Sequence, residues 1–177
     1  MDISQKNTCL KNRGINFLHV APEYCFSKYF HKKFYNYLTA DLYSDTVMVK
    51  MDITDIKYPD ESFELIIANH VLEHVSDDLK AMKELYRVLS KNGFAILMVP
   101  QTKDAITFED FSITNPKERA VAFGQDDHVR RYGQDYSSRL EKAGFNVKVI
   151  RANDLLSDNK ISKYSCGHNG DVFACTK

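Results

Sequence analysis

The sequence predicts an α/β fold: a doubly wound, mostly parallel sheet flanked by helices in three layers. Short apolar runs that suit buried strands alternate with segments of helical periodicity. The apolar runs are continuous, as expected for strands covered on both faces. The last two runs have no helical segment between them, so we expect the final strand to enter the sheet antiparallel.

Local signals delimit each element. Residues 63–68 (FELIIA) are the clearest strand, and Pro22 is expected in the first turn of the first helix. Ser76 is expected to cap the second helix, which Lys91 and Gly93 close, and Asp135 to cap the third. The expected strands cover residues 16–21, 37–42, 47–51, 63–68, 94–99, 145–150 and 172–175, and the expected helices residues 22–33, 76–91 and 135–143.

We expect a single domain over residues 1–177, because no repeat, low-complexity tract or interdomain linker interrupts the sequence. The segment 101–131 is polar, weakly periodic and longer than an ordinary connection. We therefore expect an insertion there that covers a functional site as a lid.

Composition and charge limit the function classes. Lys plus Arg equals Asp plus Glu at 24 each, so nucleic-acid binding has no support from net charge. Residues 1–13 are polar and lack the apolar core of a signal peptide, and no stretch of about 20 apolar residues predicts a membrane span. Without a CxxC pair, the four cysteines are expected as free thiols in a cytoplasmic protein.

Polar residues follow several predicted strands. Asp41, Asp52, Asn69 and His70 each come at or just after a strand end, and residues 21–23 follow the first strand. Ligands of open α/β sheets bind beyond these carboxyl ends, where a carboxylate can accept both ribose hydroxyls. Strand-end Asp residues can also simply form turns. Two carboxylates at successive strand ends favour a nucleoside site.

Residues 51–100 combine an acid after the third strand, a PDxSF turn, an xxLEHV segment and an ELYRVLSKNG helix end. This combination resembles the core of type 11 class I methyltransferases, and the resemblance extends more loosely from Leu18 to Val149. It implies a Rossmann-like fold, S-adenosylmethionine as the cofactor and methyl transfer to a small-molecule acceptor. An LHxAPE turn and a GQxDHVRxYG segment resemble one subgroup of that family.

The resemblance also implies roles for individual residues. Asp41 would bind the ribose hydroxyls, Asp52 and Ile53 would line the adenine, and Asn69 and His70 would lie beside the methionine portion and the methyl group. The cofactor-binding set that we predict is His19, Ala21, Glu23, Asp41, Leu42, Asp52, Ile53, Asn69 and His70.

The first turn departs from the family pattern. Its sequence is LHVAPEY, with His19 in place of the usual acid and Ala21 and Glu23 in place of glycines. Glycines let the backbone approach the cofactor closely. The alternative is therefore a binding or scaffold protein that has the methyltransferase fold but no longer catalyses methyl transfer.

Residues 70–74 (HVLEH) match the H-x-x-E-H signature of inverted zinc peptidases. That mechanism needs both His side chains on one face of a helix. His70 directly follows a buried strand, where a long helix does not begin. A zinc hydrolase stays a remote alternative, and we predict no metal site.

The DHVRRYG segment, residues 127–133, carries the predicted catalytic residues. Position in the family pattern makes His128 a general base and Arg130 a binding group for an anionic acceptor. The alternative is a solvated charge run that enters a helix. The sequence identifies neither the acceptor nor the oligomeric state.

Overall fold

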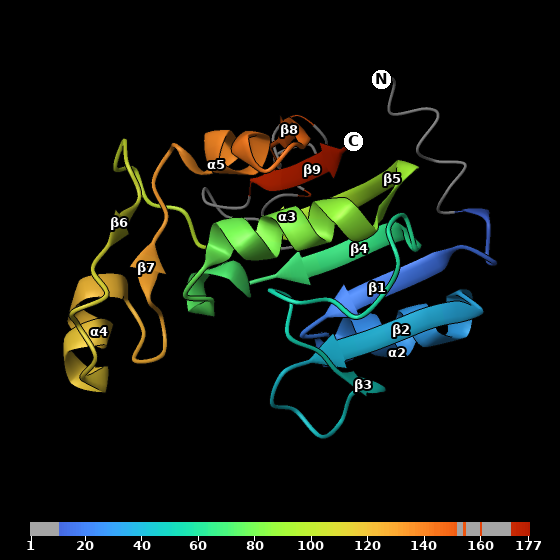
Figure 1. Cartoon of the computed structure of the whole chain (residues 1–177), viewed down its shortest axis with the longest axis horizontal. Coiled ribbons are helices and arrows are strands. Elements are labelled where there is room, and N and C mark those ends of the chain that lie inside the picture. Colours follow the sequence, from blue (N-terminus) through green and yellow to red (C-terminus); the bar gives the residue numbers. More distant parts are fainter. Residues whose placement is uncertain (1–10, 152–153, 155–159, 161–170) are drawn as a thin grey trace.

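The computed structural model describes residues 11–151, 154, 160 and 171–177 of the chain. Its main sheet contains β1 (Asn16–Val20), β2 (Asn36–Asp41), β3 (Val49–Lys50), β4 (Phe63–Asn69), β5 (Leu89–Met98), β8 (Asn146–Ile150) and β9 (Val172–Thr176). The strand order is β3-β2-β1-β4-β5-β9-β8 (Figure 1). Strands β1 to β5 pair in parallel, and β9 runs antiparallel to both β5 and β8. The predicted α/β sheet with an antiparallel last strand is confirmed.

Helices cover both faces of the sheet. In Figure 1, α3 (Asp78–Val88) lies in front of the sheet and α2 (Tyr24–Lys33) behind it. Side chains of successive strand residues alternate between the two faces. Leu18 and Ile66 therefore pack in the core under α3 and α5 (Tyr136–Lys142), whereas Phe17 packs toward α2. None of the described helices is long and apolar enough to cross a membrane.

Several predicted boundaries were wrong. Strand β5 begins at Leu89, so Lys91 and Gly93 lie within a strand instead of closing α3. A Cβ atom on Gly93 would lie 2.8 Å from the Glu64 carbonyl oxygen, so this glycine permits a close approach to β4. Asp77, not Ser76, caps α3, because its side chain accepts a hydrogen bond from the Lys80 N–H at 2.9 Å. Pro22 precedes the N-cap of α2 and is not in its first turn.

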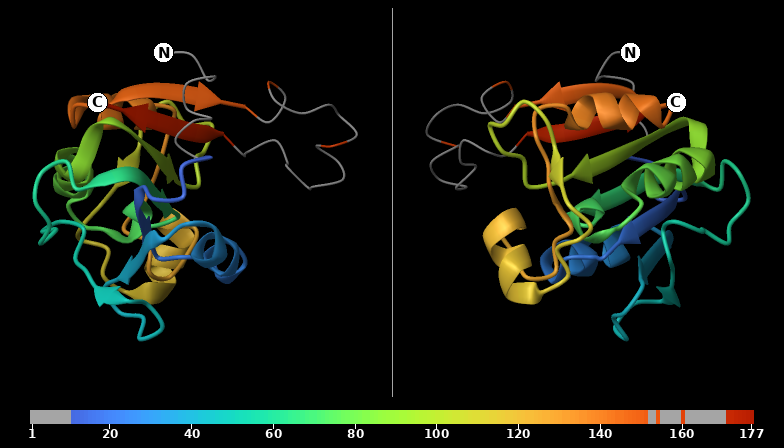
Figure 2. Two further views of the ribbon diagram at one scale, coloured as in Figure 1. Left: turned by 90° about the vertical axis from the view of Figure 1, so that its right-hand side faces the viewer. Right: turned by 60° about the vertical axis from the view of Figure 1, so that its left-hand side comes forward.

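The segment 101–131 forms elements that we did not predict. It contains β6 (Phe108–Glu109), α4 (Pro116–Phe123) and β7 (Arg130–Arg131), with β6 and β7 paired antiparallel. Figures 1 and 2 show it beyond the carboxyl ends of β1, β2 and β4. That position fits a lid over a ligand site, and closure remains a prediction. Most of the polar connection between β8 and β9 is outside the described residues.

Candidate functional site

The sheet changes winding direction between β1 and β4. The chain leaves β1 toward α2 on one face, and leaves β4 toward the 3-10 turn η1 (Leu72–His74) and α3 on the other. Both strand ends turn through a left-handed residue, Ala21 with φ 46° and His70 with φ 55°. Left-handed conformations are uncommon for residues other than glycine and cluster at functional sites. This topological switch point is where ligands of such sheets bind.

Ala21 keeps the backbone conformation that a glycine would adopt. Its N–H donates to the Ala40 carbonyl at 2.8 Å, which fixes the turn against β2. A left-handed conformation costs an L-residue about 1–2 kcal/mol. The turn therefore has at Ala21 the positive φ that glycine adopts without this cost.

The Ala21→Gly variant is expected to raise the free energy of unfolding by up to about 1 kcal/mol. Glycine removes the strain of the left-handed conformation, which stabilises the folded state. This gain exceeds the roughly 0.4–1 kcal/mol by which glycine lowers stability, because glycine gives the unfolded chain more conformational entropy. Urea unfolding measures the difference. Ala143→Gly is the matched control, because Ala143 is right-handed and should lose stability. An equal loss in both variants would contradict the strain at position 21.

Glu23 connects the ends of β1 and β4. One carboxylate oxygen lies 3.0 Å from His19 Nε2, and the other accepts a hydrogen bond from the Asn69 side-chain amide at 3.0 Å. The Tyr37 hydroxyl lies 2.7 Å from His19 Nδ1. Burial lowers the pKa of His19, although the neighbouring Glu23 carboxylate opposes the change. His19 is thus a hydrogen-bonded, buried histidine that holds Glu23 at the switch point.

Asp41 ends β2 and forms the turn that follows it. Its Oδ1 accepts hydrogen bonds from the backbone N–H groups of Tyr43 and Ser44, both at 2.7 Å. The Asp41 Oδ2 accepts no hydrogen bond from any of the described residues. The carboxylate therefore combines the turn-forming role with one oxygen left for a ligand. Leu42, in the same turn, is exposed.

Asp52 and Ile53 lie beyond the end of β3. Asp52 is exposed, and its Oδ1 accepts hydrogen bonds from the backbone N–H and hydroxyl of Thr54, both at 2.8 Å. The Ile53 side chain is buried in the core under α3. Only the backbone of Ile53 can therefore face a ligand beyond the strand ends.

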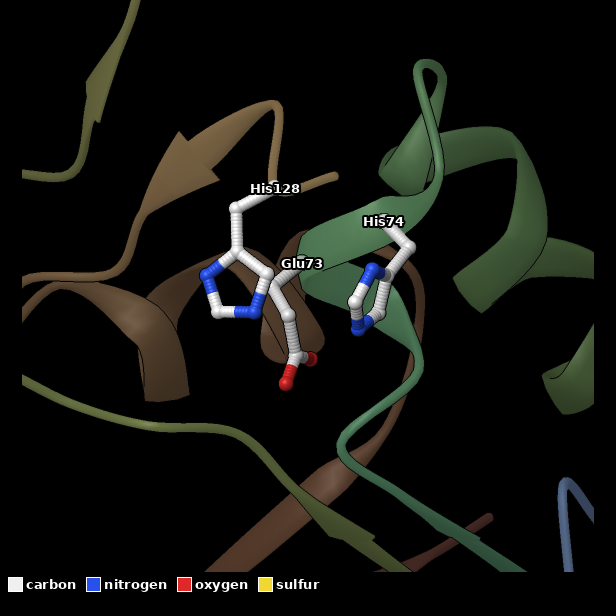
Figure 3. A group of neighbouring side chains, drawn as sticks. All are labelled: Glu73, His74 and His128. Atoms are coloured by element: carbon white, nitrogen blue, oxygen red, sulfur yellow. The ribbon is translucent and has the colours of Figure 1, made fainter. Parts of the chain in front are cut away.

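A second group of polar side chains gathers after β4. Glu73, His74 and His128 each offer a ligand atom, and these atoms lie within 4.8 Å of one another. Figure 3 shows the Glu73 carboxylate between the two imidazole rings, whose centroids are 4.7 Å apart. Glu73 is 1% exposed, and neither carboxylate oxygen accepts a hydrogen bond from another residue within the described part of the chain. The His70 Nδ1 lies 3.5 Å from Oε1.

Burial controls the charges of this group. It raises the pKa of Glu73 to about 7, above the ordinary carboxyl value, and the nearby Asp127 adds to the rise. Burial and then His74 lower the pKa of His128. His128 is therefore neutral near pH 7, and its buried position differs from the solvated charge run that we considered as an alternative.

Backbone contacts hold His128 next to η1. The Val129 N–H donates to the Glu73 carbonyl at 2.9 Å. Arg130, 1% exposed, donates to the carbonyls of Leu72, Val75 and Ser76 and to the Glu109 carboxylate. These bonds occupy the guanidinium within the protein, so the arrangement favours a positioning role for Arg130 over acceptor binding.

The sequence contained both halves of the Glu73–His74–His128 group but not their contact. We interpreted HVLEH as part of the methyltransferase motif and, remotely, as a helical zinc motif, and DHVRRYG as an acceptor loop or a solvated charge run. The 3-10 turn places Glu73 and His74 beside a histidine from the insertion, an arrangement unlike two histidines on one helix. The sequence did contain one signal for this group: a Glu-His pair shortly after a strand end and a further His in the insertion.

The sequence itself matches a known family over this region. A family model described as a methyltransferase domain matches residues 10–97, which include β1 to β4, the switch point and all but the last residue of β5. The chain carries a class I methyltransferase domain. Ajmaline N-methyltransferase of Rauvolfia serpentina is 29% identical over 70 residues, which are 40% of this chain. The match covers only 24% of that plant protein.

Solved structures share the fold of this methyltransferase domain. An S-adenosylmethionine-dependent methyltransferase from Mesorhizobium loti superimposes with a TM-score of 0.66 at 14% identity, over 98% of this chain and 96% of that one. The 1,6-didemethyltoxoflavin-N1-methyltransferase of Burkholderia thailandensis, solved with bound 1,6-didemethyltoxoflavin and S-adenosylhomocysteine, gives a TM-score of 0.62 at 12% identity, over 93% of this chain and 72% of that one. At these identities the likeness extends to the fold alone.

Proposed function

We propose that this chain is an S-adenosylmethionine-dependent methyltransferase that acts on a small-molecule acceptor. The observation that carries the proposal is the switch point between β1 and β4, where Ala21 and His70 turn left-handed in a domain matching the methyltransferase family. S-Adenosylmethionine would bind beyond the carboxyl ends of β1, β2 and β4. The retained turn at Ala21 favours an active cofactor site over the scaffold alternative.

The cofactor roles follow from the groups left free at the strand ends. Asp41 Oδ2 would accept from the ribose hydroxyls, because Oδ1 is engaged in the turn. Glu23 would attract the amino group of the methionine portion and is already oriented by His19 and Asn69. Asp52 would accept from the adenine amino group at the neighbouring strand end. Two carboxylates also favour the cationic sulfonium cofactor electrostatically.

The acceptor would lie over the end of β4, beside His70 and His128 and beneath the 101–131 insertion. Methyl transfer is an in-line displacement, so most of the catalysis comes from positioning donor and acceptor. His128 is the predicted group for the acceptor proton. Arg130, with its donors used inside the protein, would act by holding the insertion in place.

Asp41→Asn is expected to weaken S-adenosylmethionine binding by about 10–100-fold, measured by calorimetry with the cofactor and with S-adenosylhomocysteine. Loss of hydrogen bonds to a charged group costs about 1.5–3 kcal/mol. The asparagine keeps a carbonyl oxygen for the Tyr43 and Ser44 N–H groups, so the turn should survive.

Asp45→Asn is the matched control, because Asp45 lies in the same connection with its side chain 96% exposed. Its cofactor affinity should equal that of the wild type. Unchanged affinity in Asp41→Asn would remove Asp41 from the cofactor site. No binding by the wild type at high micromolar cofactor would overturn the methyltransferase proposal in favour of the scaffold.

A further inference from the structure

We propose that Glu73, His74 and His128 form a binding site for a first-row divalent transition-metal ion. The three side chains come from the η1 turn and from the 101–131 insertion, and they converge beyond the carboxyl end of β4 (Figure 3). From the sequence we predicted no metal site. The site would also make His128 a metal ligand in place of the predicted general base.

The buried carboxylate is the strongest observation. Glu73 is 1% exposed, and neither of its oxygens accepts a hydrogen bond from another of the described residues. An unsatisfied buried carboxylate is costly unless it is paired or coordinates a metal. His70 supplies only a 3.5 Å contact from a ring that is 57% exposed. A cation between Glu73 and the two imidazoles would satisfy the carboxylate.

Both imidazoles are oriented as metal ligands usually are. The His128 Nδ1 lies 3.3 Å from the Phe123 carbonyl oxygen, which can only accept, so Nδ1 carries the proton and Nε2 keeps its lone pair. The His74 Nδ1 lies 3.2 Å from the Asp127 carboxylate, which orients that ring in the same way. A carbonyl or carboxylate on the second ring nitrogen is the common outer-sphere arrangement of metal-bound histidines.

The spacing and the donor types indicate which ions fit. Bonds of about 2.0–2.2 Å place two donors about 3.3–3.6 Å apart on a tetrahedral ion. The three ligand atoms now lie within 4.8 Å of one another, so side-chain rotations must bring them closer together around the ion. Two imidazoles and a carboxylate suit Zn²⁺, Fe²⁺ or Co²⁺ better than Mg²⁺, which prefers oxygen ligands and water. Three protein ligands leave an open coordination position.

The open position would take a hydroxyl oxygen of the acceptor, a step that rests on the proposed methyltransferase function. The ion would lower the pKa of that hydroxyl, whose proton passes to water. The oxygen then bonds to the methyl carbon as the carbon–sulfur bond breaks, and the electron pair stays on sulfur in S-adenosylhomocysteine. The acceptor class is then a small molecule with a hydroxyl group.

Metal binding is tested on the full chain, stripped with a chelator, without cofactor or acceptor. Co²⁺ is followed by its visible absorption and Zn²⁺ by calorimetry. We expect one equivalent of each at this site in the wild type and at least a 100-fold weaker affinity in both Glu73→Gln and His74→Asn. Asp127→Asn, which alters only the outer sphere, should weaken binding by about 10–100-fold.

Glu73→Gln keeps the side-chain volume and removes a buried charge, and His74 is partly exposed, so both variants should fold. The control is the double variant Cys25→Ser/His31→Asn, which removes an exposed thiol and an exposed imidazole on α2 and should bind as the wild type does. Wild-type affinity in Glu73→Gln and His74→Asn, or no ion bound by the wild type, would overturn the site.

The open position is tested with acetohydroxamate, a chelating oxygen ligand, added to the Co²⁺ protein. A changed visible spectrum supports an oxygen acceptor at the ion, and an unchanged spectrum would overturn that step. Cofactor calorimetry is independent of these readouts. Cofactor binding without metal binding overturns the metal site alone, whereas metal binding without cofactor binding overturns the methyltransferase proposal alone.

Discussion

Replacement of Arg130 by methionine is expected to lower the free energy of unfolding by about 3–5 kcal/mol, the range for removing one partner of a buried ion pair. The guanidinium donates to three carbonyls around η1, and its Nε lies 3.0 Å from Glu109 and 3.6 Å from Asp78. Methionine fills much of the volume but leaves the Val75 and Ser76 carbonyls without this donor, whereas the Leu72 carbonyl and both carboxylates keep other donors. Urea or thermal unfolding measures the loss.

The same charges line a hollow of about 480 Å³ beside the first turn of α3, with Glu109 and Arg130 from the insertion and Arg139 from α5. Arg139 donates to Asp78 at 2.8 Å and contacts Glu109, and the Tyr132 hydroxyl donates to Asp78 at 2.7 Å. Burial raises the pKa of Tyr132, so its hydroxyl remains a donor. These charges are paired with one another. Their ion pairs therefore hold the insertion against α3 and α5.

Arg131→Met is the matched control for Arg130→Met. Arg131 is the next residue of β7, its side chain is 41% exposed, and its salt bridge is with the exposed Asp104. Exposed pairs contribute about 0–1 kcal/mol, so this variant should change stability little. The competing role for Arg130, binding of an anionic acceptor, predicts near-wild-type stability with a raised KM. That combination of results would contradict the positioning role.

The parallel sheet was predictable because its signal is local. Continuous apolar runs such as residues 63–68 identify strands covered on both faces, and right-handed crossovers then leave few topologies. The start of β5 was missed because Leu89 follows a strong helical stripe without a break. Gly93 resembled a helix terminator, whereas the structure uses its missing side chain to bring β5 against Glu64.

Helix α4 was missed although its end signals are present. Asn115 caps the helix by accepting from the Lys117 N–H at 2.9 Å, Pro116 follows in the first turn, and Gly124 ends it with φ 98°. Its apolar periodicity is weak because Phe123 is its single buried residue within the described helix. A prediction based on an apolar stripe cannot find a helix that packs so little of its surface.

Only those site residues that directly follow a predicted strand could be identified from the sequence. Asp41 and Asp52 were found from their positions, whereas their turn-forming hydrogen bonds require the three-dimensional course of the following loops. The meeting of Glu73 with His128 depends on the Val129–Glu73 backbone bond between segments far apart in sequence. No local pattern encodes that contact. The left-handed turn at Ala21 was hidden because alanine rarely adopts it.

Gly133→Ala is expected to lower the free energy of unfolding by about 3 kcal/mol, the upper part of the range for overpacking. A Cβ atom at this position would lie 2.5 Å from the Ile106 carbonyl carbon and 2.8 Å from the Asp104 carbonyl oxygen. These are backbone atoms, which cannot rotate away as a side chain would. The Gly133 N–H also donates to the Thr107 hydroxyl at 3.2 Å, so the two crossing segments must separate together.

The displacement should reach the candidate site, because β7 and His128 precede Gly133 on the same segment. We expect faster hydrogen exchange of the Val129 amide, which donates to the Glu73 carbonyl, in addition to the lower stability. Gly14→Ala is the matched control, since its nearest neighbour would be the Asn12 side-chain oxygen at an ordinary 3.5 Å. Equal stabilities of Gly133→Ala and Gly14→Ala, together with unchanged exchange of the Val129 amide, would show that the close approach of Gly133 to Ile106 does not position the insertion. The position of His128 would then depend on the Arg130 hydrogen bonds and on the Val129–Glu73 backbone bond.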